Sequence, residues 1–118
     1  MGVHHGFFRG HTYFLPGGDI GRLAVKGTVN DLAMSGAVRL MAAALILEEG
    51  PVLEDLKRVV DSMRAAAEEA GVLLVTDDTK AVNRGRGDPV CITTTGLGVI
   101  ERILVISSGR ARPGDLIF

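Results

Sequence analysis

Residues 17–37 read GGDIGRLAVKGTVNDLAMSGA, and this stretch constrains the fold more than any other part of the sequence. Asp19 is a residue type favoured immediately before a helix, because its carboxylate can accept a hydrogen bond from a backbone N–H of the first turn. Gly36 is favoured just after a helix, where the backbone often adopts a positive φ. We therefore predict a helix from about residue 19 to residue 35, with most of its surface apolar.

Asp31 is the residue of this helix that most suggests chemistry. It lies about 20° from Ile20 around the helix axis, inside the apolar arc and away from the polar stripe formed by Arg22, Lys26 and Asn30. A buried carboxylate without a partner costs several kcal/mol, so Asp31 needs a cation, a set of donors or an opening to solvent. Two interpretations stay open: a metal site, or an ordinary ion pair at a helix edge that is less buried than the pattern implies.

The rest of the chain predicts a sheet with helices packed against it. From apolar periodicity and turn residues we expect a strand over 39–47, a helix over 52–70, strands over 72–82 and 89–100, and a short strand over 103–107. The segment 83–88 suits a hairpin loop. With a first strand around His11–Leu15, the order β-α-β-α-β-β predicts an α+β fold, a mixed β-sheet with helices on one face.

The composition excludes several classes of protein. A chain of 118 residues is one ordinary domain, and its net charge of −1 lacks the basic surplus that nucleic-acid binders need. The hydrophobic share of 47% is more than a small interior can bury, so we expect a homo-oligomer. The single cysteine, Cys91, excludes an internal disulfide and a cysteine-based zinc site.

The sequence contains no signal for membrane insertion or export. The longest apolar stretch without a charge, Leu40–Leu47, is far shorter than the roughly 20 residues of a membrane helix. The first residues, Met1–Gly6, lack the basic start and the apolar segment of a signal peptide. We expect a cytoplasmic protein that binds neither nucleic acid nor a membrane.

The segment Thr76–Lys80 is a second candidate for chemistry. In an extended chain Asp78 and Lys80 project to the same side. A carboxylate and an ammonium that converge at a strand end suit Mg²⁺ and a phosphate, because Mg²⁺ binds through one or two carboxylates plus phosphate oxygens. The alternative is a polar strand end with solvated charges. The glycines around Asp19, at the start of the first helix, are a weaker indication of an anion site.

Several segments together resemble one family. They are the stretch 17–37 already quoted, Ala43–Gly50, Asp78–Lys80 and Thr93–Val99. In this order and spacing they look like the hydrogenase maturation factor HypE family (carbamoyl dehydratase), within the PurM-like or aminoimidazole ribonucleotide synthetase superfamily. The resemblance runs from about Tyr13 to the end of the chain.

The resemblance implies a PurM-like amino-terminal domain that dimerises through its sheet and binds ATP and Mg²⁺ near the dimer interface. The family's metal-binding aspartates fall on Asp31 and Asp78, and we assign Asp19, Asn30 and Lys80 to the nucleotide. In the family, ATP drives dehydration of a carbamoyl group, carried on a carboxy-terminal cysteine, to a nitrile. HypF supplies the carbamoyl group, and the HypC–HypD complex receives the cyanide.

The sequence also departs from the family pattern. An early Thr-Asp-Ser metal motif is expected near Gly6, where no acid stands, and Asp77 replaces a glycine. We divide the chain into a loosely ordered segment 1–18, the PurM-like domain 19–110 and the start of a missing second domain at 111–118.

These departures predict a truncated or degenerate HypE-like domain that homodimerises, with weak or lost Mg²⁺–ATP affinity and no dehydration by this chain alone. Two alternatives stay open. One is a ligand-free structural homodimerisation module, and the other is a small metal-dependent hydrolase that uses Asp31, Asp77 and Asp78.

Overall fold

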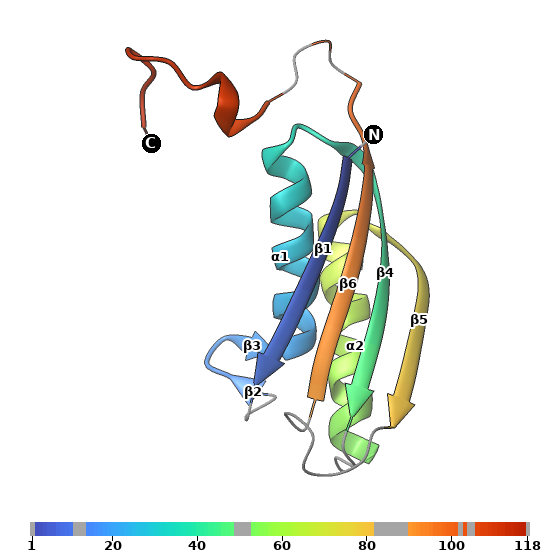
Figure 1. The fold of residues 1–118 in the computed structure, drawn as a ribbon. Coiled ribbons are helices and arrows are strands. Elements are labelled where there is room, and N and C mark those ends of the chain that lie inside the picture. Colours follow the sequence, from blue (N-terminus) through green and yellow to red (C-terminus); the bar gives the residue numbers. More distant parts are fainter. Residues whose placement is uncertain are drawn as a thin grey trace.

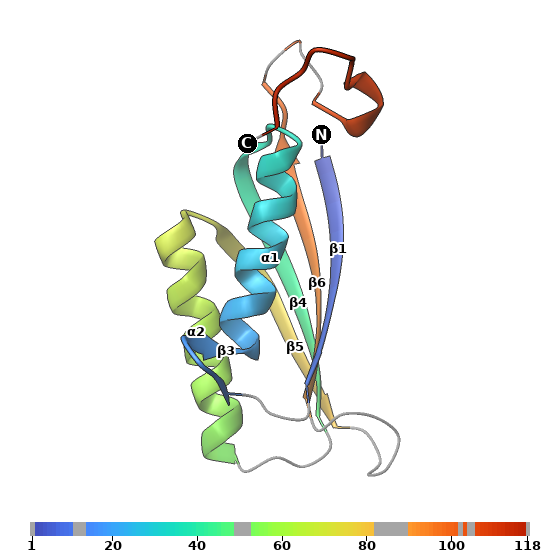
Figure 2. The ribbon, with the colours of Figure 1, turned by 90° about the vertical axis from the view of Figure 1, so that its left-hand side faces the viewer.

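The computed structural model describes residues 2–10, 14–48, 53–81, 90–101, 103 and 106–117. Its elements are β1 (Gly2–Gly10), β2 (Phe14–Leu15), β3 (Gly18–Asp19), α1 (Ile20–Met34), β4 (Val38–Glu48), α2 (Leu53–Ala70), β5 (Leu73–Ala81), β6 (Val90–Val99) and the short 3₁₀ helix η1 (Ser108–Arg110). They form two layers, with α1 and α2 on one face of a four-stranded sheet (Figures 1 and 2).

The sheet is mixed, as the sequence predicts. The strand order is β1-β6-β4-β5. Strand β6 is antiparallel to both of its neighbours, whereas β4 and β5 are parallel and are joined through α2. A parallel pair needs such a crossover connection, and the helix in it packs back onto the sheet. The expected fold class, α+β with helices on one face, is confirmed.

The predicted hairpin between the last two long strands is wrong. Strand β4 lies between β5 and β6, so these two strands do not pair with each other. The physical reason is the continuous apolar run of β4, which needs a central position in the sheet. The loop 83–88 itself lies outside the described residues, as do 104 and 105 of the predicted strand 103–107. The described residues of that range are not in a strand.

The amino-terminal segment also differs from the prediction. The expected loosely ordered segment 1–18 instead contains the edge strand β1, which pairs with β6 from Gly2 to Gly10. Of the expected strand His11–Leu15, only Phe14–Leu15 falls within the described residues, and it pairs with β3. Backbone hydrogen bonds to β6 hold β1, so its many glycines do not prevent strand formation. The domain therefore begins well before residue 19.

Both helices end as their sequences predict. Helix α1 follows Asp19, and Gly36 adopts a φ of +75° just beyond its C-terminus. Helix α2 ends at Ala70, and Gly71 adopts a φ of +66°. The left-handed backbone at these two positions closes each helix, which only glycine does without strain.

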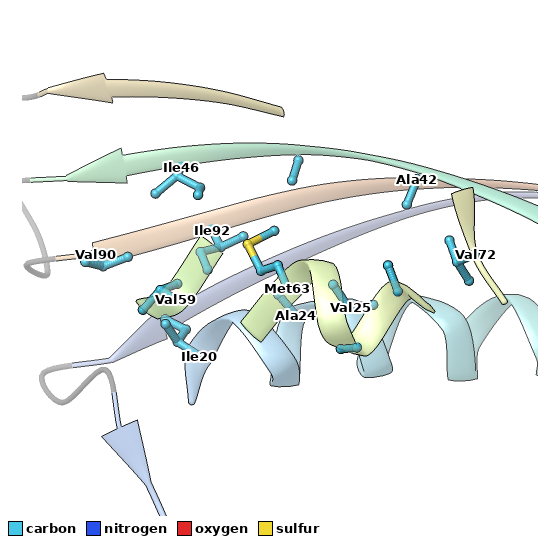
Figure 3. Close-up of a cluster of buried hydrophobic side chains, with 13 residues drawn as sticks. Ile20, Ala24, Val25, Ala42, Ile46, Val59, Met63, Val72, Val90 and Ile92 are labelled. Carbon is cyan, nitrogen blue, oxygen red and sulfur yellow. The ribbon is translucent and has the colours of Figure 1, made fainter. Parts of the chain in front are cut away.

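The core lies between the two helices and the sheet (Figure 3). Helix α1 contributes Ile20, Ala24 and Val25, and α2 contributes Val59 and Met63, together with two alanines. The sheet contributes three side chains of β4 and two of β6. One face of each layer is therefore buried, and the sheet face opposite the helices carries no other described element (Figure 2).

The described part of the chain beyond β6 extends away from the two layers (Figure 1). Ile103, Leu116 and Ile117 are strongly exposed there. Ile106 lies close to Gly36, at the end of α1. No described helix is long and apolar enough to cross a membrane.

Candidate functional site

Asp19 caps helix α1. Its Oδ1 accepts a hydrogen bond from the backbone N–H of Arg22 at 2.9 Å, and its side chain is buried. This geometry confirms the capping role that the sequence predicts. Beside it is a hollow of about 360 Å³, which is lined by Pro16, Gly17, Gly18, Asp19, Arg22, Leu23 and Lys26. The Oδ1 atom of Asp19 is engaged in the cap. The assignment of Asp19 to a nucleotide stays a prediction.

The polar stripe of α1 contacts the end of α2. Glu69 accepts a hydrogen bond from Arg22 Nη2 at 2.7 Å and one from Lys26 Nζ at 3.4 Å. The Lys26 hydrogen bond, together with the charges of Arg22 and Lys26, holds the pKa of Glu69 below its ordinary value. The exposed Asn30 lies on the same side, in a hollow of about 550 Å³ whose other lining residues are Lys26, Val29, Ala33, Glu69 and Ala70.

Asp31 is exposed, so its predicted place in a buried apolar arc is wrong. The buried residues of α1 are Ile20, Gly21, Ala24, Val25, Thr28 and Leu32. Leu23 and Met34, which the sequence places in the apolar arc, are 49% and 67% exposed. The buried face is therefore rotated toward Thr28 and Leu32, which leaves Asp31 on its flank.

The direction of that flank follows from the residues around it. Thr28 faces β6, where its hydroxyl meets that of Thr94. Val25 and Val29 lie to one side of Thr28, in the core shared with α2. At about 100° per residue, Asp31 lies about 60° to the other side of Thr28. Helix α1 contacts β1 on that side, so Asp31 occupies the flank of α1 toward the β1 edge of the sheet.

Asp78 and Lys80 lie on β5, at the opposite edge of the sheet. They pair in register with positions 45 and 47 of β4, which alternate with the buried Ala44 and Ile46. Because successive residues of a strand face opposite sides, Asp78 and Lys80 share the sheet face that the helices leave uncovered. Both are exposed, and Asp78 Oδ1 accepts a hydrogen bond from the N–H of Thr79 at 2.9 Å.

Asp31 and Asp78 therefore do not share a pocket within one chain. Asp31 belongs to the helical layer beside β1, whereas Asp78 belongs to the uncovered face at β5. The two edges are separated by the width of the sheet. Among the described residues, no group of three or more His, Cys, Asp or Glu side chains could hold a metal ion.

Sequence reasoning missed the close contact between α1 and β6. Thr28 and Thr94 are buried and hydrogen-bonded to each other, and Gly96 lies against Thr28 and Leu32. The threonines around Thr94 fit strand propensity, which gives no sign of this contact. The available signal was a threonine in a mostly apolar helix, because a buried hydroxyl requires a partner.

The family assignment follows from a comparison that covers most of the chain. Residues 3–100 match the family described as AIR synthase related protein, N-terminal domain. The chain belongs to this AIR synthase related family. The match begins at the second residue of β1 and ends one residue after β6, so it covers nearly all of the two-layer domain.

Within the AIR synthase related family, this domain is HypE-like. It is 63% identical over 105 residues to hydrogenase expression/formation protein HupE of Azotobacter chroococcum mcd 1. It is 60% identical over 105 residues to carbamoyl dehydratase HypE of Cupriavidus necator. Each alignment covers 88% of this chain, but only 31% and 30% of the relative. The chain thus spans about a third of the length of these relatives.

Solved structures agree with this assignment. A crystal structure of hydrogenase maturation protein HypE in complex with ATP has a TM-score of 0.88 at 48% identity, over 95% of this chain and 34% of that one. A chain of a HypE–HypF complex has a TM-score of 0.72 at 50% identity, over 85% of this chain and 33% of that one. The PurM-like fold expected from the resemblance is confirmed.

Proposed function

We propose that this domain binds ATP with Mg²⁺ as part of a HypE-type carbamoyl dehydratase in hydrogenase maturation. The observation that carries the proposal is the 48% identity and 0.88 TM-score to a HypE that was crystallised with ATP. HypF is the partner that supplies the carbamoyl group, by analogy with the HypE–HypF complex. The HypC–HypD complex as acceptor of the product and the cytoplasmic location stay predictions.

In this proposal, the domain forms a homodimer through the uncovered face of its sheet. Thr93 and Leu97 of β6 are only partly buried there, and Leu73 at the β5 edge is 63% exposed. A central strand with one open face leaves apolar surface in water, and a second copy of the same face is the simplest cover for it.

A dimer also explains how two distant carboxylates form one site. Asp31 flanks the β1 edge, and Asp78 lies on the β5 edge. A two-fold arrangement in which β5 of one copy lies beside β1 of the other brings each Asp31 toward the partner's Asp78. Two such sites would form per dimer, each incomplete within one chain.

The residues present suit Mg²⁺ and a phosphate. Mg²⁺ prefers carboxylate oxygens in small number together with phosphate oxygens and water. Asp31 and Asp78 are both exposed, and the exposed ammonium of Lys80 lies on the same sheet face as Asp78. A cation held by both carboxylates would neutralise phosphate charge while Lys80 contacts the phosphate.

The proposed chemistry needs ATP for a simple reason. An amide oxygen is a poor leaving group, so phosphoryl transfer to that oxygen converts it into one. Phosphate then leaves with the oxygen, both protons leave the nitrogen, and the carbon–nitrogen bond becomes a nitrile. Cys91 is not the carrier thiol in this proposal, because it is buried in β6.

The composite site predicts complementation between two inactive variants. We expect Asp31→Asn and Asp78→Asn each to abolish the stabilisation by Mg²⁺–ATP, which should reach about 2.7 kcal/mol at 100 times the Kd for the wild type. After the two variants are unfolded and refolded together, half of the dimers are mixed, and each mixed dimer holds one intact site. Calorimetric titration should then find about a quarter of the wild-type sites.

The control is each variant refolded with itself, which should show no binding. Complementation that fails although both variants dimerise would rule out a site shared between copies. No stabilisation of the wild-type chain at millimolar Mg²⁺–ATP would contradict nucleotide binding altogether.

The dimer predicts a specific effect of charge on the open sheet face. Thr93→Arg places a guanidinium in the centre of the proposed interface, so we expect the variant to sediment as a monomer while the wild type sediments as a dimer. Ala65→Arg, on the exposed surface of α2, is the matched control and should remain dimeric. A monomeric wild-type chain at micromolar concentration would refute the interface.

A ligand-free dimerisation module is the second candidate. The observation that favours it is the separation of Asp31 and Asp78 within one chain. It predicts a dimer that Mg²⁺–ATP does not stabilise, so the two experiments above distinguish it. No observation on the described residues favours the metal-dependent hydrolase.

A further inference from the structure

Helix α1 packs tightly against β6 at Gly96. A Cβ atom built at this glycine would lie 2.6 Å from Leu32 Cδ1 and 2.7 Å from Thr28 Cγ2. Such distances are well inside van der Waals contact, so a side chain at this position would force the Thr28 and Leu32 side chains to move or would push α1 away from the sheet. Thr28 and Leu32 are one helical turn apart, and together they seat α1 on the backbone of β6.

A relay of hydroxyl groups fixes the same contact. The Thr28 hydroxyl donates to the Ala24 carbonyl oxygen at 2.9 Å. A hydroxyl has one proton, so the Thr94 hydroxyl is the donor in its hydrogen bond with Thr28 Oγ1. Both threonines are almost fully buried, at 1% and 2% exposure. Rotation of α1 about its axis would break this bond in a place that water cannot reach.

The contact matters because Asp31 follows Thr28 by three residues and precedes Leu32. A side chain carried about 6 Å from the helix axis moves by about 2 Å when the helix turns by 20°. Metal ligands tolerate far smaller displacements, on the order of 0.2 Å in distance. The orientation of α1 therefore determines whether the Asp31 carboxylate reaches a cation.

We propose that Thr28, Thr94 and Gly96 are positioning residues, which hold Asp31 in the direction that Mg²⁺ binding requires. This inference rests on the proposed function, because it gives these three residues a role in metal affinity as well as in stability. They act through the orientation of α1 and have no contact with the ligand.

Thr94→Val tests the inference. The variant keeps the shape of the side chain and removes the hydroxyl. We expect the Mg²⁺ concentration for half-maximal ATP binding to rise by about tenfold, the usual scale for loss of a group that orients a metal ligand. ATP affinity in the absence of Mg²⁺, from an NMR titration, should not change. Thr94→Ser, which retains the hydroxyl, should restore the wild-type Mg²⁺ dependence.

Two controls separate positioning from a general loss of stability. Ser62→Ala removes a hydroxyl from α2, outside both the α1–β6 contact and the proposed interface, and should leave the Mg²⁺ dependence unaltered. Val72→Ala removes buried methyl groups beside β5 and lowers stability without touching the contact. An equal rise of the Mg²⁺ requirement in Val72→Ala, or no rise in Thr94→Val, overturns the inference.

A measurement without ligand keeps the inference separate from the proposed function. Residual dipolar couplings report the direction of α1 relative to the sheet in the free protein, and we expect Gly96→Ala to change them for α1. Should the wild-type chain bind no nucleotide, the proposed function fails. These couplings then decide whether the three residues fix the direction of α1. Unchanged couplings overturn it, and a reoriented α1 supports it. If Thr94→Val does not fold, Thr28→Val/Thr94→Val, which leaves no hydroxyl unpaired, replaces it.

Discussion

Ile92→Ala is expected to lower the free energy of unfolding by about 2–5 kcal/mol, the usual range for removing a large aliphatic side chain from a core. Ile92 is 0% exposed and projects from the central strand β6 toward both helices (Figure 3). Its neighbours in the cluster come from every layer, including Ile20 of α1, Met63 of α2 and Ile46 of β4. These side chains are held by two helices and a sheet, so they cannot move together to fill the cavity.

Urea unfolding followed by circular dichroism measures this loss. The matched control is Ile103→Ala, which deletes the same atoms from a side chain that is fully exposed, and which should change stability by less than about 0.5 kcal/mol. If the two variants unfold at the same urea concentration, Ile92 does not lie in the core that the structure shows.

Gly21→Ala is the second large effect, and it is expected to destabilise the protein although alanine is the better helix former. A Cβ atom at Gly21 would lie 2.5 Å from the carbonyl oxygen of Val59 and 2.7 Å from Met63 Cγ. The carbonyl belongs to the backbone of α2 and cannot rotate away. We expect a net loss of about 1–3 kcal/mol, because this overlap outweighs the roughly 1 kcal/mol of helix propensity gained.

The sign of the change is the informative measurement. Gly109→Ala is the control, because no atom lies within 4 Å of a Cβ built there and its backbone is not in the left-handed region. A stability equal to or above that of the wild type for Gly21→Ala would mean that α1 and α2 do not approach each other as closely as described. The same loss in both variants would point to the unfolded state instead.

Both variants change the core close to the elements that carry the proposed site. Gly21 lies two residues after the capping Asp19, so a shift of α1 away from α2 would move the start of the helix. Ile92 lies two residues before Thr94, on the same face of β6. The Mg²⁺ dependence of ATP binding is therefore comparable between these variants only at temperatures well below the melting point of each.

The sequence was sufficient for the elements whose signals are local. The Asp19 cap and the glycines at 36 and 71 bound the two helices within about two residues of their observed ends. The alternation around Asp78 and Lys80 placed both residues on one face of β5. Each of these features depends on backbone geometry over a few neighbouring residues, which the sequence encodes directly.

Features that depend on long-range pairing were not predictable in the same way. Strand β1 has three glycines in nine residues and a weak apolar pattern, yet its backbone pairs with β6 along its whole length. The position of β4 between β5 and β6 likewise follows from how the strands assemble, and no single segment specifies it. The side-chain pattern within one strand carries little information on which other strand pairs with it.

The position of Asp31 shows this division between sequence and structure most clearly. By itself the sequence determined that residues 19–35 form a largely apolar helix and that Asp31 stands near its end. Only the tertiary structure decided which side of that helix is buried, because Gly21 and Gly96 let α1 pack closely at those two points. Leu23 and Met34 are exposed although both are apolar, so residue type alone does not predict which side of the helix is buried. A helix turns as a rigid body, so its closest contacts set the direction of every other side chain it carries.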